Sequence, residues 1–331
     1  MAKKIRVIQY GLGTIGMETA RLCLEKQSLE LAGAIDIDPV KVGKDAGELC
    51  NGKRAGVIVS DSAKKVFSLA KADVVVHTTV SSLAKAESQI IEALESGLNV
   101  VSTTEELSFP IGENKKIAER LDKIAGKNNV SVLGVGVNPG FVMDALPLML
   151  TAPCQKIEKI EISRQIDASN RRIPFQKKIG STLSVEEFDK KVAEGTIRHV
   201  GLPESLSMIA HCLGFKDFEF SQTIGPIISD KEIALSWGTI RKGSVRGVKQ
   251  TAIAKVNGKE IISMNFRAGI GEPESFDAVK IHGVPPIDMK IAGGTHGDRA
   301  TAAIAVNMVP VAFAAGAGLK TMADFVPKIT L

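Results

Sequence analysis

A glycine-rich turn near the start of the chain constrains the fold more strongly than any other feature. The apolar run Ile5–Tyr10 predicts a buried parallel strand, and a helical pattern follows at Thr14–Leu24. Between the two stands a GxGxxG sequence. In this context the motif is typical of a Rossmann-type dinucleotide-binding unit; the alternative is a glycine-rich turn that binds nothing. We expect cofactor contacts from Gly11, Gly13, Thr14, Ile15 and Gly16.

The spacing of apolar residues divides the chain into two parts. Strand and helix patterns alternate over about the first 135 residues, which favours an α/β fold with a doubly wound parallel sheet. Longer strand patterns then predict a second α+β domain with a mainly antiparallel sheet. The predicted domains are residues 1–137, with a C-terminal helix at 298–331 packing back on them, and residues 138–297. The pattern also predicts a strand at Gly56–Val59 and a connecting helix at Phe141–Leu150.

An acidic residue beyond the second predicted strand bears on the choice of cofactor. Asp36 follows Gly16 by 20 residues, where a carboxylate accepts hydrogen bonds from the adenosine ribose. The same carboxylate repels a 2′-phosphate, so the sequence predicts that NAD is preferred. Asp38 is a competing candidate, although a turn before Pro39 also explains it. Lys41 and Lys44 follow closely and leave use of NADP open.

Polar residues stand at three further strand ends. In an open α/β sheet, ligands lie beyond the carboxyl ends of the strands. We therefore expect Thr78, Thr79 and Thr103 to contact the pyrophosphate and the nicotinamide ribose, and Asn138 to contact the nicotinamide carboxamide or a substrate group. The alternatives are helix caps for the hydroxyl groups and an Asn-Pro-Gly turn for Asn138.

Paired carboxylates follow the fifth predicted strand. Glu105 and Glu106 come directly after Thr103-Thr104, at the edge where a nicotinamide would lie. A carboxylate there is suited to general acid–base chemistry if partial burial raises its pKa. A solvated loop or helix start is the alternative explanation.

Composition excludes several classes of protein. The net charge of +5 comes from scattered basic pairs, with no basic stripe carrying stacking aromatic residues, so we expect no nucleic-acid partner. No apolar run reaches 18 residues and no signal peptide is apparent, so we expect a cytoplasmic protein without a membrane anchor. The four cysteines form no CxxC pair, so we expect free thiols and no metal site.

Six segments across nearly the whole chain match one family together. They are GLGTIG at 11–16, KVGKDAGEL at 41–49, NVVSTTEELSFP at 99–110, VLGVGVNPGFVMDALP at 132–147, RRIPFQKKIG at 171–180 and GGTHGDRATAAIAVNMVP at 293–310. With these segments the chain resembles 2,4-diaminopentanoate dehydrogenase and the related native amine dehydrogenases, which share the general layout of dihydrodipicolinate reductase. The GKDAGE and GGTHGD portions are much more specific than the glycine turn.

The resemblance implies a reaction and roles for particular residues. Such enzymes oxidise a primary amine with NAD(P)⁺ to an imine, which water hydrolyses to a ketone and ammonia; in reverse they perform reductive amination. Their catalytic acid matches Glu105, with Glu106 as the fallback. If the substrate is a diamino acid, its carboxylate needs a cation, and the candidates in the second domain are Arg164, Arg171 and Arg172, for each of which a solvated surface position is the alternative. His296 is a candidate for closing the pocket, or else a helix-entry residue.

Two other functions stay open. One is a dihydrodipicolinate reductase-like reduction of a C=N or C=O bond, although that enzyme carries adjacent histidines and this chain's five histidines are all separate. The other is a dinucleotide sensor without catalysis, against which the doubled glutamate argues. Analogy with related folds also predicts a homodimer.

Overall fold

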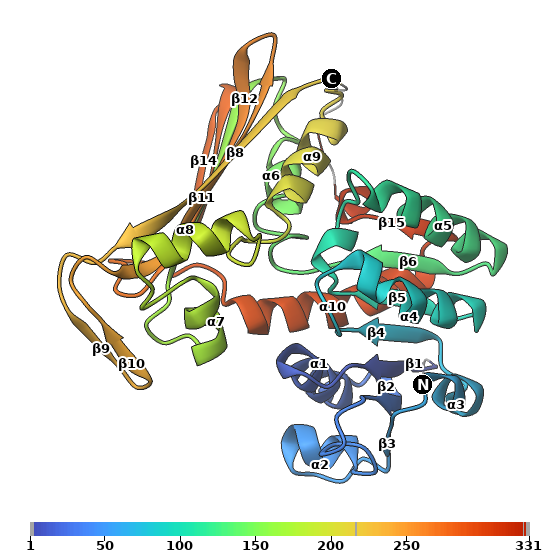
Figure 1. Cartoon of the computed structure of the whole chain (residues 1–331). Helices are drawn as coiled ribbons and strands as arrows, with labels where there is room; N and C mark the ends of the chain where they lie inside the picture. The colour runs from blue at the N-terminus through green and yellow to red at the C-terminus, as the bar shows by residue number, and fades with distance from the viewer. Residues whose placement is uncertain (1–2, 216, 327, 329–331) are drawn as a thin grey trace. The chain divides into compact units, whose positions relative to one another are not determined.

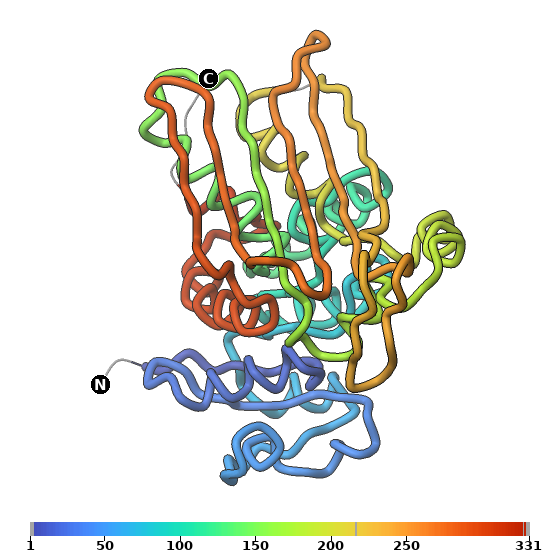
Figure 2. The backbone as a smooth tube through the Cα atoms, turned by 90° about the vertical axis from the view of Figure 1, so that its left-hand side faces the viewer, coloured from blue at the N-terminus to red at the C-terminus, as the bar shows by residue number. Residues whose placement is uncertain are grey.

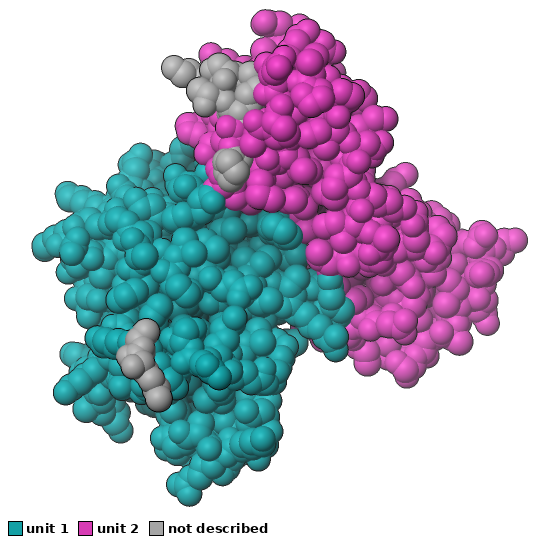
Figure 3. All heavy atoms as spheres, turned by 180° about the vertical axis from the view of Figure 1, so that it is seen from behind, with its two compact units in different colours: residues 1–141, 296–325 teal, residues 142–295, 326–331 magenta. Residues whose placement is uncertain are grey.

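The computed structural model describes residues 3–215, 217–326 and 328. These residues form two compact units, one made of the chain up to residue 141 together with 296–325, the other made of residues 142–295 (Figure 3). The boundaries predicted at residues 137 and 297 lie close to these divisions. No helix among the described residues is both long and apolar enough to cross a membrane.

The first unit contains a seven-stranded sheet in which every neighbouring pair is parallel (Figure 1). The strand order is β15-β6-β5-β4-β1-β2-β3. Successive strands are added on one side of β1 up to β3 and on its other side from β4 onward, as in a doubly wound fold. The predicted fold class is therefore confirmed. The strands are β1 (Ile5–Tyr10), β2 (Leu29–Ile35), β3 (Val59–Ser60), β4 (Val74–His77), β5 (Asn99–Ser102), β6 (Ser131–Gly134) and β15 (Gly318–Lys320).

Helices cover both faces of this sheet, because its central strands are apolar on both sides. One face packs against α3 (Ala63–Ala70), α4 (Leu83–Glu95) and α5 (Asn114–Lys127), which contribute residues to one apolar cluster with Ile8 and Val100. Three helices pack against the other face, where a second apolar cluster includes Leu31 of β2. These helices are α1 (Thr14–Glu25), α2 (Ala46–Asn51) and α10 (Gly297–Ala314).

The C-terminal segment of the first unit differs from the prediction of one continuous helix over 298–331. The helix α10 ends at Ala314, and the chain then forms β15 beside β6 and a short 3-10 helix, η2 (Met322–Phe325). The Ser131 hydroxyl donates to the carbonyl of Ala312 at 2.7 Å, which ties the end of α10 to β6. Residues 327 and 329–331 of the predicted helix lie outside the described residues.

The second unit contains a six-stranded sheet in the order β14-β13-β7-β12-β11-β8 (Figure 2). All its neighbouring pairs are antiparallel except β7 and β12, so the predicted mainly antiparallel sheet is confirmed. The strands are β7 (Lys156–Asp167), β8 (Glu219–Ile228), β11 (Val245–Val256), β12 (Lys259–Gly269), β13 (Phe276–Val284) and β14 (Ile287–Ala292). Four helices and the hairpin of β9 (Ile233–Leu235) and β10 (Gly238–Ile240) complete the unit. The helices are α6 (Ala145–Leu150), α7 (Ile173–Lys178), α8 (Val185–Ala193) and α9 (Leu202–Cys212).

The predicted connecting helix at Phe141–Leu150 begins four residues later than expected, with α6 at Ala145. Asp144 accepts the backbone N–H of Ala145 at 2.6 Å and the hydroxyl of Ser205 at 2.6 Å. The carboxylate thus caps the helix and joins it to α9, and this long-range partner was not visible in the local pattern.

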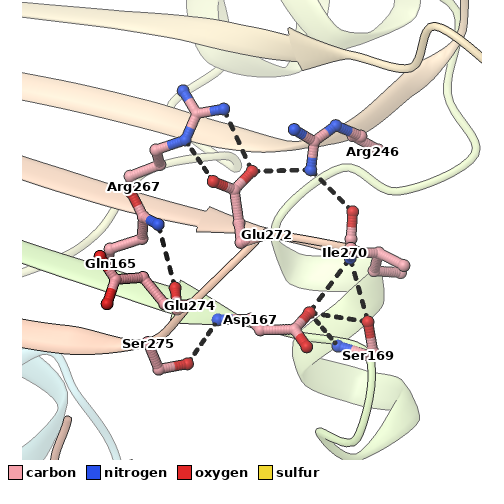
Figure 4. A network of polar contacts seen from close by, with 10 residues as sticks. Gln165, Asp167, Ser169, Arg246, Arg267, Ile270, Glu272, Glu274 and Ser275 are labelled. Atoms are coloured by element: carbon pink, nitrogen blue, oxygen red, sulfur yellow. Dashed lines mark hydrogen bonds and ion pairs between the residues drawn. The ribbon is translucent and has the colours of Figure 1, made fainter. Parts of the chain in front are cut away.

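Ion pairs fix the loop between β12 and β13 (Figure 4). The buried Glu272 carboxylate pairs with Arg246 and Arg267, each at 2.6 Å. Asp167, at the end of β7, accepts the N–H groups of Ser169 and Gly271 at 3.1 Å each. Because a buried carboxylate needs charged or N–H partners, these contacts hold the end of the sheet in one arrangement.

A second buried carboxylate organises the segment after β2, which includes the GKDAGE sequence. Asp45 Oδ1 accepts the N–H groups of Gly47, Glu48 and Ala55 at 2.8–3.2 Å, and Oδ2 accepts that of Gly56 at 2.7 Å. These bonds cap α2 and clamp the following loop against it. They also explain why the strand predicted at Gly56–Val59 begins later than expected: the N–H of Gly56 is used by Asp45, Ile58 forms an isolated bridge, and β3 begins at Val59.

Replacing Asp45 with alanine is expected to lower the free energy of unfolding by roughly 3 kcal/mol, because four N–H groups lose a charged acceptor. Burial opposes ionisation of Asp45, but the N–H donors outweigh it and lower its pKa. The stabilisation is therefore present above the ordinary aspartate pKa and is lost as the pH falls through the lower folded-state pKa. Denaturant titration at pH 3–7 should show a shallower acid dependence for Asp45→Ala. The exposed Asp61→Ala is the control, and an unchanged midpoint for Asp45→Ala would contradict the clamp.

Candidate functional site

The structure explains why glycine stands at each of the three positions of the turn. Gly11 has φ +89°, and a Cβ there would lie 2.9 Å from the carbonyl oxygen of Thr78. A Cβ on Gly16 would lie 1.9 Å from the carbonyl oxygen of Gly11, so α1 approaches β1 this closely only without a side chain. A Cβ on Gly13 would meet no described atom within 4 Å. Gly11 and Gly16 therefore serve the fold, whereas the space beside Gly13 suits the approach of a ligand.

The start of α1 offers hydrogen-bond donors at the same place. Gly13 is the N-cap and has no side chain with which to cap the helix. The N–H groups of Thr14 and Ile15, in the first turn, have no partner within the helix in an α-helical pattern. Together with the helix dipole they form an arrangement that suits a pyrophosphate.

Asp36, which follows β2, lies against this turn. Its Oδ2 accepts the N–H of Leu12 at 2.6 Å, and its Oδ1 accepts that of Asp38 at 2.8 Å. Lys41 Nζ lies 3.6 Å from Asp36 Oδ2 and 3.0 Å from Asp38 Oδ2. A ribose hydroxyl would therefore meet a carboxylate with a lysine beside it, and the position of that lysine could not be fixed from the sequence.

The hydroxyl groups at the end of β4 are used within the protein. Thr78 Oγ1 donates to the carbonyl of Gly11 at 2.9 Å and accepts from Gln9 at 2.9 Å. Thr79 Oγ1 lies 2.7 Å from Gln89 Oε1 and 2.9 Å from His77 Nε2. These contacts favour a structural role for both side chains over the predicted contact with a ligand.

The paired glutamates occupy η1 (Glu105–Leu107), a 3-10 turn after β5. Glu106 Oε2 accepts the N–H of Leu83, the first residue of α4, at 2.9 Å and a proton of the Asn114 amide at 3.3 Å. Glu105 Oε2 is shielded from solvent, although the residue as a whole is only half-buried. The contacts of Glu106 explain its presence by the fold and so favour Glu105 as the acid.

Thr103 and Asn138 follow β5 and β6, and the carboxyl ends of neighbouring parallel strands share one sheet edge. The N–H of Thr103 donates to the carbonyl of His77 at 2.9 Å, and its side chain is half-buried. Asn138 is buried, and the N–H of the preceding Val137 donates to Thr301 on α10 at 3.3 Å. Both predicted nicotinamide contacts therefore belong to the same unit and sheet edge as Glu105.

Two of the predicted substrate residues have structural contacts. Arg164 is buried in the second unit, where Nη1 pairs with Asp277 at 2.5 Å and Nη2 donates to the carbonyl of Thr295 at 2.8 Å. His296 caps α10, and its Nδ1 accepts the N–H of Arg299 at 3.4 Å. These contacts favour a role in folding for both residues rather than recognition of a substrate.

Arg171 and Arg172 lie in the loop before α7. The guanidinium of Arg171 lies 4.5 Å from the centre of the Phe175 ring, and Arg172 is exposed. Sequence reasoning also missed His199, whose ring stacks on Phe266 at 4.3 Å. Burial, with the nearby charges of Lys178 and Arg164, lowers the pKa of His199 to about 3. A lone histidine in a mixed segment gives no sequence signal of such a stack.

Comparisons with known proteins agree along the whole chain. Residues 141–330 match the model of the 2,4-diaminopentanoate dehydrogenase C-terminal domain, and residues 5–130 match that of the dihydrodipicolinate reductase N-terminus. The chain is 35% identical to 2,4-diaminopentanoate dehydrogenase of Acetoanaerobium sticklandii, over 98% of this chain and 95% of that protein. It is 30% identical to 4-hydroxy-tetrahydrodipicolinate reductase of Moorella thermoacetica, over only 51% of this chain and 61% of that protein.

A solved structure shows the same fold. The amine dehydrogenase from Mycobacterium smegmatis superposes with a TM-score of 0.83 at 22% identity, covering 96% of this chain and 95% of that chain. The reductase likeness thus belongs to the dinucleotide-binding half, as the sequence indicated, whereas the second half matches the diaminopentanoate dehydrogenase model.

The geometry of the turn predicts opposite outcomes for two similar substitutions. Gly13→Ala should leave the melting temperature unchanged, because its Cβ enters open space, and should weaken dinucleotide binding by about tenfold or more by filling that space. Gly16→Ala should destabilise the protein by roughly 1–3 kcal/mol or more, because its Cβ overlaps the carbonyl of Gly11. Calorimetric titration with NAD⁺ and thermal unfolding measure both effects. Equal affinity of Gly13→Ala and the wild type would exclude the space beside Gly13 as the ligand site.

Proposed function

The chain belongs to the 2,4-diaminopentanoate dehydrogenase family, and from this membership we propose that it oxidises a primary amine with NAD(P)⁺ to a ketone and ammonia. The proposed substrate is 2,4-diaminopentanoate or a similar amine, and the reverse reaction is reductive amination. The observation that carries the proposal is the pair of glutamates after β5. One of them is used by the fold as a cap of α4, which favours the other as a catalytic acid.

The residues at the sheet edge fit a nicotinamide dinucleotide. Open space beside Gly13, the N-terminus of α1 and the carboxylate of Asp36 suit the pyrophosphate and a ribose. We assign the nicotinamide end to Thr103 and Asn138. When bound, the cofactor supplies the acceptor for a hydride from the amine carbon.

The protein's own part is to bind the amine and to move protons. A carbon atom bonded to a positively charged ammonium group does not readily release a hydride, so the amine must first become neutral. In our proposal Glu105 accepts that proton and releases it to solvent, and the carboxylate so restored accepts a proton from the water that attacks the imine. Shielding of its Oε2 from solvent favours this role, because a carboxylate that exchanges protons near neutral pH needs a partly desolvated environment.

The alternatives are less well supported. A dihydrodipicolinate reductase-like activity rests on the first half of the chain, and the doubled glutamate argues against a sensor without catalysis. We also propose that the protein is a homodimer and is located in the cytoplasm. The broad sheet of the second unit, covered by helices on one side, is what supports the dimer (Figure 2).

The substrate assay tests the reaction class directly. Primary amines should reduce NAD⁺ and the corresponding alcohols should not. If Arg171 or Arg172 binds a carboxylate, 2,4-diaminopentanoate should exceed the matching diamine without a carboxylate by about tenfold or more in kcat/KM, since a charged hydrogen bond contributes about 1.5–3 kcal/mol. Arg172→Ala should reduce that ratio. Reduction of NAD⁺ by alcohols alone would refute the proposed function.

The second test concerns preference between the cofactors, for which we propose NAD with some use of NADP. Asp36→Ser combined with Ile37→Arg should raise the NADP⁺/NAD⁺ ratio of kcat/KM by about tenfold or more, because the repelling carboxylate is lost and an exposed position gains a cation. Lys41→Ala should act in the opposite direction, since Lys41 is the cation beside Asp36. Equal efficiency of the wild type with both cofactors would remove the role given to Asp36.

The third test separates an enzyme from a sensor. Glu105→Gln preserves the shape of the side chain and removes the proton acceptor, so kcat should fall by roughly 10²–10⁴-fold. The affinity for NAD⁺ should change little, because the turn and Asp36 hold the dinucleotide. Glu106→Gln is the matched control: it should lower the melting temperature through the cap of α4 and spare turnover. If only Glu106→Gln abolished turnover, the assignment of the acid would be wrong by one residue.

A further inference from the structure

A buried row of polar side chains joins the ends of β4 and β5, and the proposed reaction does not use it. His77 closes β4 and Ser102 closes β5, and the two are paired directly in the parallel ladder. Their exposed fractions are 1% and 0%. His77 Nδ1 lies 2.9 Å from Ser102 Oγ, which lies 3.0 Å from Thr104 Oγ1. Thr104 Oγ1 lies 2.9 Å from the carbonyl oxygen of Val80, in the loop after β4.

Counting protons gives this row a direction. A carbonyl oxygen has no proton, so the Thr104 hydroxyl must donate to Val80. The Ser102 hydroxyl must then donate to Thr104, because the single proton of Thr104 is already used. Only a proton on His77 Nδ1 can then satisfy the last contact. Since buried polar groups are almost always hydrogen-bonded, the imidazole carries its proton on Nδ1.

The other ring nitrogen sets a condition on this assignment. His77 Nε2 is then a lone-pair acceptor, and it lies 2.9 Å from the Thr79 hydroxyl and 2.8 Å from Gln89 Oε1, which also accepts the Thr79 hydroxyl at 2.7 Å. The two ends of a carboxamide have the same shape, so the Nδ1 proton requires Gln89 to turn its NH₂ group toward the ring, where it shares the single lone pair of Nε2 with the Thr79 hydroxyl. Burial lowers the pKa of His77 to about 4, so the ring is neutral near pH 7.

The aromatic ring of Tyr10 limits rotation of this imidazole. Tyr10 is the last residue of β1 and pairs with His77 in the ladder. The two ring centres are 5.5 Å apart with an interplanar angle of 76°, an edge-to-face contact. Hydrogen bonds at both ring nitrogens and contact with the Tyr10 ring thus hold the imidazole in place.

We propose that His77 is a positioning residue, which acts through Ser102 and Thr104 to hold the loop of Glu105 against the loop that follows β4. The proposal rests on the role proposed for Glu105, the residue directly after Thr104. The N–H of Thr104 also donates to Ser102 Oγ at 3.1 Å, so both the backbone and the side chain of Thr104 are fixed. A displacement of about 1 Å at a reacting group can cost 10²-fold in rate, so this fixation bears on catalysis.

A relay of neutral groups suits this position. An ion pair behind the strand ends would have to be desolvated and would add its field to the carboxylate of Glu105. Two hydroxyl groups and a neutral imidazole give the same directional restraint without a charge. The restraint should therefore affect turnover much more than binding of the dinucleotide, which contacts the chain elsewhere.

The experiment has a spectroscopic arm and a kinetic arm. Long-range ¹H–¹⁵N NMR of the wild-type protein at pH 7 should show the His77 proton on Nδ1. Thr104→Val, which removes only the hydroxyl function, should lower kcat by roughly tenfold or more and leave KM for NAD⁺ within about twofold. Thr104→Ser keeps the hydroxyl and should recover most of that loss. Ser68→Ala, at an exposed hydroxyl on α3, is the control and should resemble the wild type.

Each outcome bears on the proposal. A proton on Nε2, an unchanged kcat in Thr104→Val, or equal impairment of Thr104→Ser and Thr104→Val would overturn it. If Thr104→Val fails to fold, Ser102→Ala provides the kinetic test. The NMR arm needs no substrate, so a wild-type protein that oxidises no amine would contradict the proposed function while an Nδ1 proton would still support the relay.

Discussion

The close approach of α1 to β1 at the glycine turn is the contact on which the first unit depends. Gly16 lies so near the carbonyl of Gly11 that no side chain fits, and Gly11 lies against the carbonyl of Thr78. One turn therefore sets the position of α1 and the spacing of the loops after β1 and β4. The carboxyl ends of β5 and β6 lie at the same sheet edge as that of β4. The loops after β5 and β6 therefore bring Thr103, Glu105 and Asn138 to this edge.

Short polar contacts then fix each loop at that edge. Asp45 clamps the segment after β2, and Glu106 caps α4 from the loop after β5. In both cases a carboxylate accepts backbone N–H groups, which is a way to order a loop that has little apolar surface to bury. The segments most specific to the family thus contain residues that serve its fold, and a specific motif does not by itself identify a catalytic residue.

The sequence was sufficient for features set by local pattern and insufficient for those set by distant partners. Alternating strands and helices predicted the parallel sheet, and the glycine turn was expected between β1 and α1, where it lies. The strand β15 was missed, because three residues after a long helix carry no periodicity of their own. The choice between Glu105 and Glu106 was also beyond the sequence, since it depends on a contact with Leu83, 23 positions away.

Arg164 illustrates the same limit for charged residues. On a strand with polar and apolar residues in alternation, an arginine is expected to face solvent or a ligand, yet this one is buried against Asp277 on the neighbouring strand. A buried guanidinium without its partner would cost several kcal/mol, so the native sheet requires both charges of the pair. The second unit thus holds its sheet with paired charges, at Arg164 and around Glu272. Behind the strand ends of β4 and β5 the first unit instead uses a neutral imidazole and hydroxyl groups, a choice that gives direction to its contacts without placing a buried charge beside Glu105.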